Sequence, residues 1–371
     1  MTINDPIRSG IIGTGFMGRV HTRAVRSAHG TVVAYAGRDL GSTAAAASSA
    51  GVPLALTPDE LVVHPEVDLV HICTPNAQHF ELASAAIAAG KSVICEKPLA
   101  LSHADASELD RAARHAGVVN AVPFVYRYYP AVREARARIL ASGDRVWLAH
   151  GHYLQDWLTS EHSYNWRVAD GMSRAFADIG VHWCDLFEFV SGHRITRLSA
   201  QTSKLHETRY SVGREVPVLT EDAVTLIFAT DLGATGSVVV SQASPGRKNR
   251  LWFELDGADA SYMFDQENPD RLEIGSVGGT LTVPKGLETT AAAGAVSPYV
   301  LVPSGHPQGY QDLFTLFTEE VHSAVRGRPV EGMPSFIDGV RAAQLTEAVI
   351  ASSVSGTWQD LNAVAPESVS G

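Results

Sequence analysis

Cysteine, net positive charge and long apolar runs are scarce or missing in this chain of 371 residues, and each absence excludes a class of protein. The three cysteines, Cys73, Cys95 and Cys184, form no C-x-x-C pair, which argues against a disulfide scaffold and favours a reducing cytoplasm. A formal charge of −11 disfavours nucleic acid and anionic membranes as partners. No apolar run reaches the roughly 18 residues that span a bilayer. We therefore expect a cytoplasmic protein without a nucleic-acid or membrane partner.

The first third of the chain alternates short apolar runs with helical segments. The expected strands are Ile7–Ile12, Thr31–Ala36, Val67–Cys73 and Ser92–Cys95. The expected helices are Phe16–His29, Ala44–Ala50, Phe80–Ala89 and Leu101–His115. Such alternation predicts βαβ units and an α/β fold with a doubly wound parallel sheet. Because the pattern stops near Pro123, we expect one domain over residues 1–123 and a second over residues 124–371.

The second part of the chain follows a different pattern. A helix is expected over Ala131–Ala141, and Asp312–Val325 and Ser335–Ser352 return to helical periodicity. Between them lie six expected strands, namely Trp147–Tyr153, Ile195–Thr202, Ala223–Ala229, Gly236–Gln242, Arg250–Leu255 and Ser261–Phe264. Strands that follow one another through turns predict a mostly antiparallel sheet. Gly278–Pro298, rich in Gly, Thr and Ala, is expected to be a mobile loop.

The segment Gly13–Gly18 (GTGFMG) is a G-x-G-x-x-G turn between an expected strand and an expected helix. Gly13 allows the tight turn, Gly15 lets the backbone approach a pyrophosphate, and Gly18 allows close packing of helix on strand. Phe16 and Met17 complete the turn. The helix start offers N–H groups to an anion. A merely structural turn is the alternative, but the context favours a Rossmann dinucleotide site.

The residues after the second expected strand bear on which dinucleotide binds. Selection of NAD needs an acidic side chain there to hold the ribose hydroxyl groups. Gly37 occupies the expected position and Arg38 follows, which leaves room and a bidentate donor for a 2′-phosphate. This favours NADP slightly over NAD. Asp39 could still serve NAD, and Arg38 could be an ordinary surface charge.

Four ordered motifs resemble those of a known family. After the glycine turn come Thr74–His79 (TPNAQH), Glu96–Pro98 (EKP), Asp178–Asp185 (DIGVHWCD) and Gly309–Asp312 (GYQD). Together they resemble the glucose–fructose oxidoreductase, inositol dehydrogenase and rhizopine-catabolism (Gfo/Idh/MocA) family of NAD(P)-dependent oxidoreductases. The resemblance implies a Rossmann domain followed by an α/β domain with a large open sheet. It also implies a carbohydrate-like alcohol as substrate and a homodimer or homotetramer.

The carboxyl edge of the first sheet is where open α/β sheets bind ligands. Two motifs fall there and, with the glycine turn, supply the expected cofactor contacts: Thr74, Pro75, Asn76, His79, Glu96 and Lys97. Lys97 is also expected to act in catalysis, by donating to the substrate oxygen or relaying a proton. A plain surface lysine is the alternative.

Asp178 and His182 are four residues apart, which places them on one face of a helical turn. A carboxylate beside an imidazole is typical of a general base that works near neutral pH. We expect His182 to take the hydroxyl proton and Asp178 to orient His182 or bind a neighbouring hydroxyl. Without the resemblance, an ordinary pair on a helix surface would be the better interpretation.

Aromatic and polar side chains expected to bind the substrate gather ahead of this helix. They are Tyr153, Asp156, Trp157, Asn165, Trp166 and Arg167, joined by Arg127 near the domain junction. Aromatic faces and bidentate polar groups suit a ring with several hydroxyls, although ordinary packing is the alternative. His306 is a weaker candidate, and Ser173 and Arg174 are expected to reshape the pocket relative to other family members.

Three classes of function remain open at this point. A sugar or inositol dehydrogenase comes first, and a glycosidase that oxidises its sugar transiently with NAD is the alternative. A non-catalytic sensor is disfavoured because Lys97, Asp178 and His182 are all present. His150 and His152 share one face of a strand, but no third ligand has diagnostic spacing, so no metal is expected.

Overall fold

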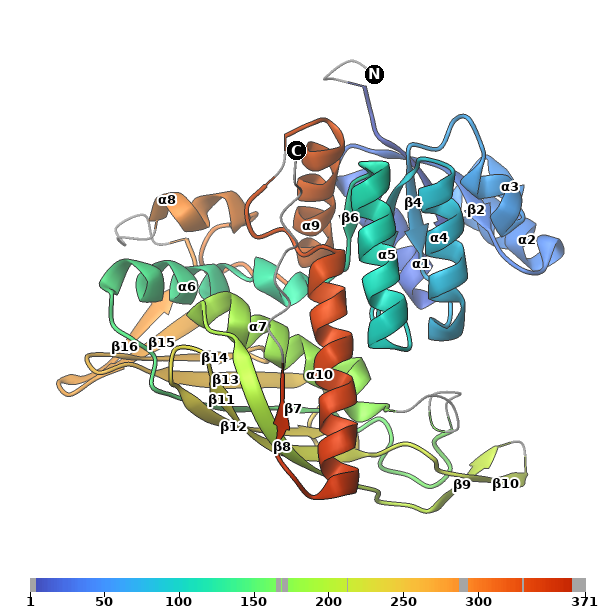
Figure 1. Ribbon diagram of the computed structural model, residues 1–371. Coiled ribbons are helices and arrows are strands. Elements are labelled where there is room, and N and C mark those ends of the chain that lie inside the picture. Colours follow the sequence, from blue (N-terminus) through green and yellow to red (C-terminus); the bar gives the residue numbers. More distant parts are fainter. Residues whose placement is uncertain are drawn as a thin grey trace. The chain divides into compact units, whose positions relative to one another are not determined.

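The computed structural model describes residues 5–164, 168, 173–211, 213–286, 293–328 and 330–361 (Figure 1). The chain forms two compact units. The first unit comprises Met1–Tyr128 and Gln308–Ala343, and the second comprises Tyr129–Pro307 and Gln344–Gly371. The segment Gln308–Ala343 therefore groups with the N-terminal part, which a single division at residue 123 does not anticipate.

The first unit is built on a six-stranded parallel sheet in the order β3-β2-β1-β4-β5-β6. Its strands are β1 (Arg8–Ile12), β2 (Thr31–Ala36), β3 (Leu54–Leu56), β4 (Leu69–Ile72), β5 (Ser92–Cys95) and β6 (Asn120–Ala121). The chain winds outward from β1 in both directions, so the predicted doubly wound sheet is confirmed. β3 and β6 were not predicted, since two or three residues show no periodicity.

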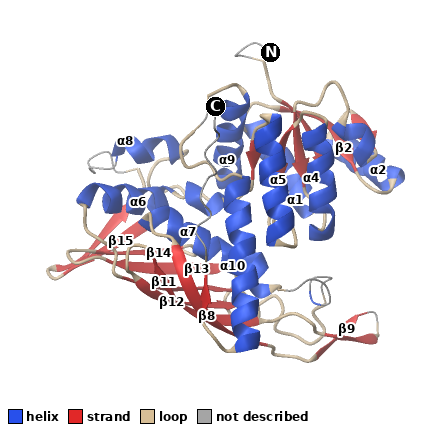
Figure 2. Ribbon diagram, in the orientation of Figure 1, coloured by secondary structure: helices blue, strands red, loops and turns tan. Residues whose placement is uncertain are grey.

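Helices cover both faces of this sheet (Figure 2). They are α1 (Phe16–Ser27), α2 (Leu40–Ala50), α3 (Pro58–Val62), α4 (His79–Ala88), α5 (His103–Ala116) and α9 (Tyr310–Val325), with short 3-10 turns at η1 (Asn76–Gln78) and η2 (Val125–Tyr128). Right-handed crossovers place α1 and α2 on one face and α4 and α5 on the other. α9 packs along α1.

The second unit contains a nine-stranded sheet in the order β16-β15-β14-β13-β7-β12-β11-β8-β17. Its strands in chain order are β7 (Leu148–Leu154), β8 (Ile195–Ser203), β11 (Ala223–Thr230), β12 (Thr235–Ser241), β13 (Arg250–Asp256), β14 (Ser261–Asp265), β15 (Arg271–Ser276), β16 (Gly279–Pro284) and β17 (Gln359–Asp360). β7 and β12 run parallel and the other pairs are antiparallel. β9 (Thr208–Ser211) and β10 (Arg214–Pro217) form a separate hairpin.

The prediction of a mobile loop over Gly278–Pro298 is wrong for its first part. Gly279–Pro284 is strand β16, paired along its length with β15. Thr and Gly suggested a loop, but the hydrogen bonds of the neighbouring strand hold this backbone extended. Ala293–Val296 then forms the short helix α8, followed by the 3-10 turn η5 (Ser297–Tyr299).

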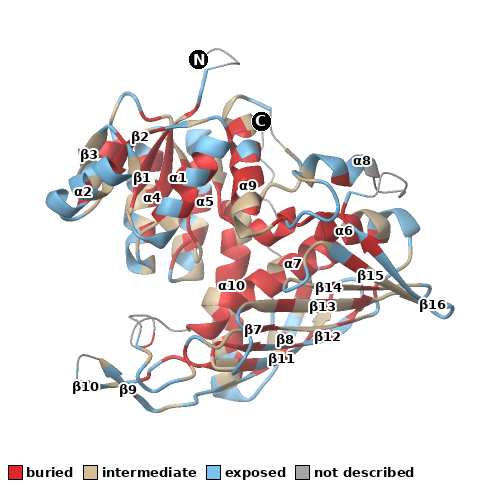
Figure 3. Ribbon diagram, turned by 180° about the vertical axis from the view of Figure 1, so that it is seen from behind, coloured by how far each residue is buried: buried red, intermediate tan, exposed pale blue. Residues whose placement is uncertain are grey.

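One face of the large sheet is covered by α6 (Pro130–Ser142) and α7 (Val181–Ser191), with the π-helical turn η4 (Phe176–Gly180) leading into α7. α7 is buried along most of its length (Figure 3). Trp183 donates its indole N–H to the carbonyl of Trp252 at 2.9 Å. Gly151 on β7 makes this contact possible, because a Cβ there would overlap the Trp183 indole.

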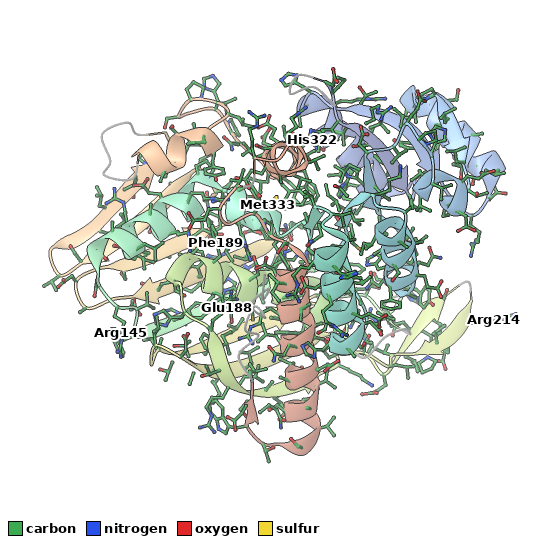
Figure 4. All side chains as sticks on the ribbon, turned by 45° about the horizontal axis from the view of Figure 1, so that its top comes forward. Arg145, Glu188, Phe189, Arg214, His322 and Met333 are labelled. Atoms are coloured by element: carbon green, nitrogen blue, oxygen red, sulfur yellow. The ribbon has the colours of Figure 1, made fainter. Side chains whose placement is uncertain are left out.

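Glu188 fixes the far end of α7 to the sheet (Figure 4). Its two carboxylate oxygens accept from the Arg194 guanidinium at 2.6 Å and from the Ile195 amide at 2.9 Å. The helix is thereby held at the start of β8.

α10 (Phe336–Ser355) completes the fold. Among the described residues, no helix combines the length and apolar composition needed to cross a bilayer.

Candidate active site

The glycine turn has the backbone that the sequence predicts for a pyrophosphate site. Gly13 adopts φ of 101°, a region that favours glycine, and its amide donates to the Ala36 carbonyl at 2.8 Å. A Cβ on Gly18 would overlap the Gly13 carbonyl oxygen, so α1 packs on the turn only without a side chain there. A Cβ on Gly15 would meet no atom within 4 Å. The space beside Gly15 is therefore open to a ligand, and a dinucleotide fits this turn.

The end of β2 explains why position 37 is glycine. A Cβ on Gly37 would lie 2.5 Å from the Thr43 hydroxyl oxygen, so a side chain there would require Thr43 to shift. Asp39 caps α2, accepting from the Ser42 amide at 2.7 Å, and this bond lowers the pKa of Asp39. Arg38 is exposed and forms no hydrogen bond or ion pair with another described residue. Of the two charged side chains, Arg38 is thus the one available to a ligand.

Two loops at the carboxyl edge are joined by His79. Its Nδ1 lies 2.7 Å from the Pro98 carbonyl oxygen and its Nε2 lies 3.0 Å from the Thr74 carbonyl oxygen. Burial lowers the pKa of His79, whereas the two carbonyl contacts raise it, because only the charged ring can donate to both oxygens at once. The Thr74 hydroxyl is buried with no hydrogen-bond partner among the described residues, which leaves it for a ligand. His79 therefore holds the loops together, and Thr74 is the better placed of the two for a cofactor contact.

Glu96 and Lys97 follow β5 at the same edge. Glu96 is buried, and its carboxylate accepts from the Lys97 amide at 3.2 Å. The other carboxylate oxygen lies 3.1 Å from Nε2 of His21 on α1. The Lys97 side chain is half-buried. We call the backbone at Glu96–Lys97 the lysine turn. Its conformation depends on the Glu96 carboxylate and, through the contact with His21, on helix α1.

The GYQD motif lies at the start of α9 in the first unit, where it contacts α1 and the glycine turn. Gln311 on α9 donates to the Val20 carbonyl of α1 at 3.2 Å. Asp312 accepts from the Gly309 amide at 2.8 Å and so caps α9. Tyr310 places its hydroxyl 3.9 Å from the Met17 sulfur in the glycine turn. The motif joins the returning segment to the dinucleotide turn.

In the second unit, Asp178 lies within the π-helical turn η4 and His182 lies in the first turn of α7. π-helical turns recur at functional sites. Gly180 permits this turn because a Cβ there would lie 2.5 Å from the Phe176 ring. Asp178 accepts from the fully buried amide of Gln242 at 2.7 Å. Sequence reasoning missed Gln242, whose only signal is a polar residue directly after the alternating strand β12.

Most of the predicted substrate residues that are described lie around one hydrogen-bond network. The Tyr153 ring lies 6.4 Å from the His182 ring, and its hydroxyl donates to Asn249 at 2.8 Å. Gln155 donates to the same Asn249 oxygen at 2.7 Å and accepts from the Trp157 indole at 2.7 Å. Gln155 and Asn249 were not predicted. Residues 165, 166 and 167, where Asn165, Trp166 and Arg167 were predicted to bind substrate, lie outside the described residues.

Asp156 stands beside this network in an ion pair. Its carboxylate accepts from Lys248 at 2.6 Å, and that bond lowers the pKa of Asp156. The Lys248 side chain is exposed, so the pair forms in high dielectric and holds Asp156 only weakly. Asp156 therefore remains accessible to a polar ligand.

Arg174 is not a pocket residue, contrary to expectation. It is fully buried, donating to the Glu221 carbonyl at 2.8 Å and to the Asp222 carboxylate. Arg209 donates to the same carboxylate at 2.8 Å, so two guanidinium groups share one buried partner. Ser173 donates to Glu221 at 2.7 Å. A buried arginine requires a paired charge, which Asp222 provides. These side chains therefore stabilise the interior of the second unit.

Three further candidates lie elsewhere. Arg127, in the first unit, is buried and paired with Asp338 at 2.7 Å, so its substrate role stays a prediction. His306 is exposed. His152 stacks on Trp252 with ring centroids 5.3 Å apart. The described residues contain no group of three or more metal-ligating side chains.

Both halves of the chain match one family. Residues 7–124 match the sequence model of the oxidoreductase family with an NAD-binding Rossmann fold. Residues 134–263 match the GFO/IDH/MocA C-terminal domain. The chain belongs to the Gfo/Idh/MocA family of oxidoreductases. The predicted resemblance is thereby confirmed.

Members of this family include sugar dehydrogenases similar to this chain. Levoglucosan dehydrogenase of Pseudarthrobacter phenanthrenivorans is 29% identical, over 95% of this chain and 97% of its own length. D-apiose dehydrogenase of Paraburkholderia graminis is 30% identical, over 74% of this chain and 71% of its own. The solved structure of levoglucosan dehydrogenase with NADH and L-sorbose superimposes with a TM-score of 0.89 and 28% identity, covering 96% of this chain and 99% of the other.

Two substitutions in the glycine turn should have different outcomes. Gly15→Val places its side chain in open space at φ of −70°, so the protein should fold but lose NADH affinity by at least about tenfold, or about 1.4 kcal/mol. Gly18→Val must displace α1 and should lower the melting temperature as well. Fluorescence titration and thermal unfolding measure the two effects. Unchanged NADH affinity in Gly15→Val would contradict the assignment of the turn.

Proposed function

We propose that the protein oxidises a secondary alcohol of a sugar, an inositol or a sugar derivative with a nicotinamide dinucleotide. The observation that carries this is the second unit's polar set, in which Gln242 holds Asp178 and Tyr153 lies beside His182. Such a set suits a ring with several hydroxyls. The dinucleotide turn of the first unit and the sugar dehydrogenases similar to this chain support the same conclusion.

The three proposed catalytic side chains have distinct roles. A nicotinamide dinucleotide held by the glycine turn would supply the hydride acceptor. Lys97 donates a hydrogen bond to the reacting oxygen, and His182 removes the hydroxyl proton as general base. Asp178 keeps its carboxylate in place through Gln242 and orients His182 or binds the neighbouring hydroxyl. In the reverse direction, His182 returns the proton to the oxygen.

The Tyr153–Gln155–Asn249 network is proposed to select the substrate. Asn249 Oδ1 accepts from both Tyr153 and Gln155, so the three polar side chains hold one another in a fixed arrangement. Trp157, 38% exposed, offers an aromatic face beside this network. Polar groups fixed beside an aromatic face reject analogues that lack the matching hydroxyl.

Replacement of His182 tests the general base. His182→Ala should lower kcat by about 100-fold or more with the melting temperature within a few degrees, because only proton removal is lost. His152→Ala, which replaces a histidine of the same unit on strand β7, is the matched control and should retain its turnover. The assay follows reduced cofactor with a panel of monosaccharides, inositols, anhydrosugars and glycosides.

Two results of that assay would contradict the proposal. Near-normal turnover in His182→Ala rejects His182 as the base. Release of aglycone from glycosides without net cofactor reduction identifies a redox glycosidase in place of a dehydrogenase.

We propose that Arg38 makes the site favour NADP. Position 37 carries no side chain, the Thr43 hydroxyl lies close to it, and Asp39 is engaged as the cap of α2. A guanidinium is the group suited to a phosphate.

Arg38→Ala should raise the KM for NADP at least about tenfold, or about 1.4 kcal/mol, and change the KM for NAD less than about twofold. Arg23→Ala, an exposed arginine on α1, is the control. Steady-state kinetics with both cofactors decide the point, and an equal change for NAD and NADP would reject a phosphate contact by Arg38.

The uncovered face of the large sheet is proposed to form a homodimer or homotetramer. Apolar side chains point outward there, with Ile227 48% and Val239 42% exposed on the adjacent strands β11 and β12. Exposed apolar patches of this kind mark contact surfaces.

Light scattering should show a dimer or tetramer for the wild type. Ile227→Lys should shift the mass toward the monomer, whereas Leu140→Lys on α6 should not. A monomeric wild type would refute the assembly.

A further inference from the structure

A buried chain of hydrogen-bonding side chains runs beneath the glycine turn of the first unit. Ser9 on β1 lies 3.1 Å from His71 Nε2 on β4, and the two Nδ1 atoms of His71 and His21 lie 2.9 Å apart. His21 on α1 continues to Glu96 at 3.1 Å, and Glu96 accepts from the Lys97 amide at 3.2 Å. Ser9, His21 and His71 are fully buried and Glu96 is 6% exposed. Buried polar groups of this kind are costly unless every one is paired.

The hydrogen-bond chain has one direction when Glu96 is a carboxylate and both histidine rings are neutral. A carboxylate only accepts, so His21 must carry its proton on Nε2. The bare Nδ1 of a neutral His21 then accepts from Nδ1–H of His71, whose Nε2 in turn accepts from the Ser9 hydroxyl. Two doubly protonated rings cannot face each other through Nδ1. Burial lowers the pKa of His71 well below its ordinary value, which agrees with a neutral ring at that place.

This series of hydrogen bonds ends at Ser9 inside the protein and therefore does not carry protons to solvent. Ser9 is fully buried, and the ring of Phe314 on α9 packs edge-on against His21 with centroids 5.1 Å apart. What remains is a mechanical role. His21 lies on α1 about one helical turn beyond Gly18, and its bond to Glu96 connects that helix to the backbone at Lys97.

We propose that His21 is a positioning residue for Lys97. It acts through Glu96 and fixes the position of the lysine turn relative to α1, the phosphate-binding helix. This rests on the catalytic role proposed above for Lys97. One oxygen of Glu96 is held by His21 and the other holds the Lys97 amide. Loss of the bond from His21 leaves the Glu96 carboxylate free to move, and the backbone at Lys97 can then move with it. A displacement of about 1 Å at a reacting group lowers turnover by up to about 100-fold.

Two substitutions of His21 each break a different one of its two hydrogen bonds. In His21→Gln the side-chain amide takes the place of Nε2 and keeps the bond to Glu96, but loses the contact with His71. In His21→Asn the amide takes the place of Nδ1 and keeps the contact with His71, but loses Glu96. Each removes one buried hydrogen bond, so the two should destabilise the fold to a similar degree.

The kinetic comparison separates positioning from stability. His21→Asn should lower kcat at least tenfold with the KM for the cofactor within about threefold, while His21→Gln keeps kcat within about threefold of wild type. Thr22→Val is the matched control, because it removes buried hydrogen bonds of the same helix, to Tyr35 and Gly18, that do not involve Glu96. It should leave kcat unchanged. Melting temperatures confirm that each variant is folded.

Histidine tautomers give an independent signature. In protein labelled with ¹⁵N-histidine, NMR should show His71 protonated on Nδ1 and His21 on Nε2. Absence of a proton on Nε2 of His21 would remove its bond to the Glu96 carboxylate and overturn the inference. Equal loss of kcat in His21→Asn and His21→Gln overturns the positioning role and leaves the proposed function standing, whereas wild-type inactivity on every alcohol of the panel overturns both.

Discussion

The first unit depends on a close approach of backbone to backbone at the glycine turn. A side chain on Gly18 would overlap the Gly13 carbonyl, so its absence sets how near α1 lies to β1. That position leaves the space beside Gly15 open for a pyrophosphate and places His21 within reach of Glu96. The same approach thus determines both the dinucleotide site and the support of the lysine turn.

Several motif residues of the first unit hold loops together, besides any contact they make with a ligand. His79 bridges the carbonyls of Thr74 and Pro98, and Gln311 joins α9 to α1. Loops at the carboxyl edge of a sheet are otherwise the mobile part of such a fold. Buried side-chain contacts with backbone carbonyls restrain these loops.

The second unit combines a rigid support with a polar surface. Trp183 and Glu188 fasten α7 to the sheet at both ends, so the helix that carries His182 is firmly placed. Gln242 reaches Asp178 from the end of β12, and Asn249 gathers Tyr153 and Gln155. The proposed catalytic side chains are thus held on a rigid helix beside an ordered polar network, as an active site requires.

The sequence alone determined the class of fold, the dinucleotide turn and the family, because glycine spacing, apolar periodicity and short motifs are local features that tertiary contacts seldom override. It did not show β16, whose Gly and Thr residues become a strand only through pairing with β15. Nor did it show Gln242 on Asp178 or His21 on Glu96, which are 64 and 75 residues apart along the chain. Only tertiary structure decides such partners, since burial and distance, and not periodicity, select which distant polar groups must pair.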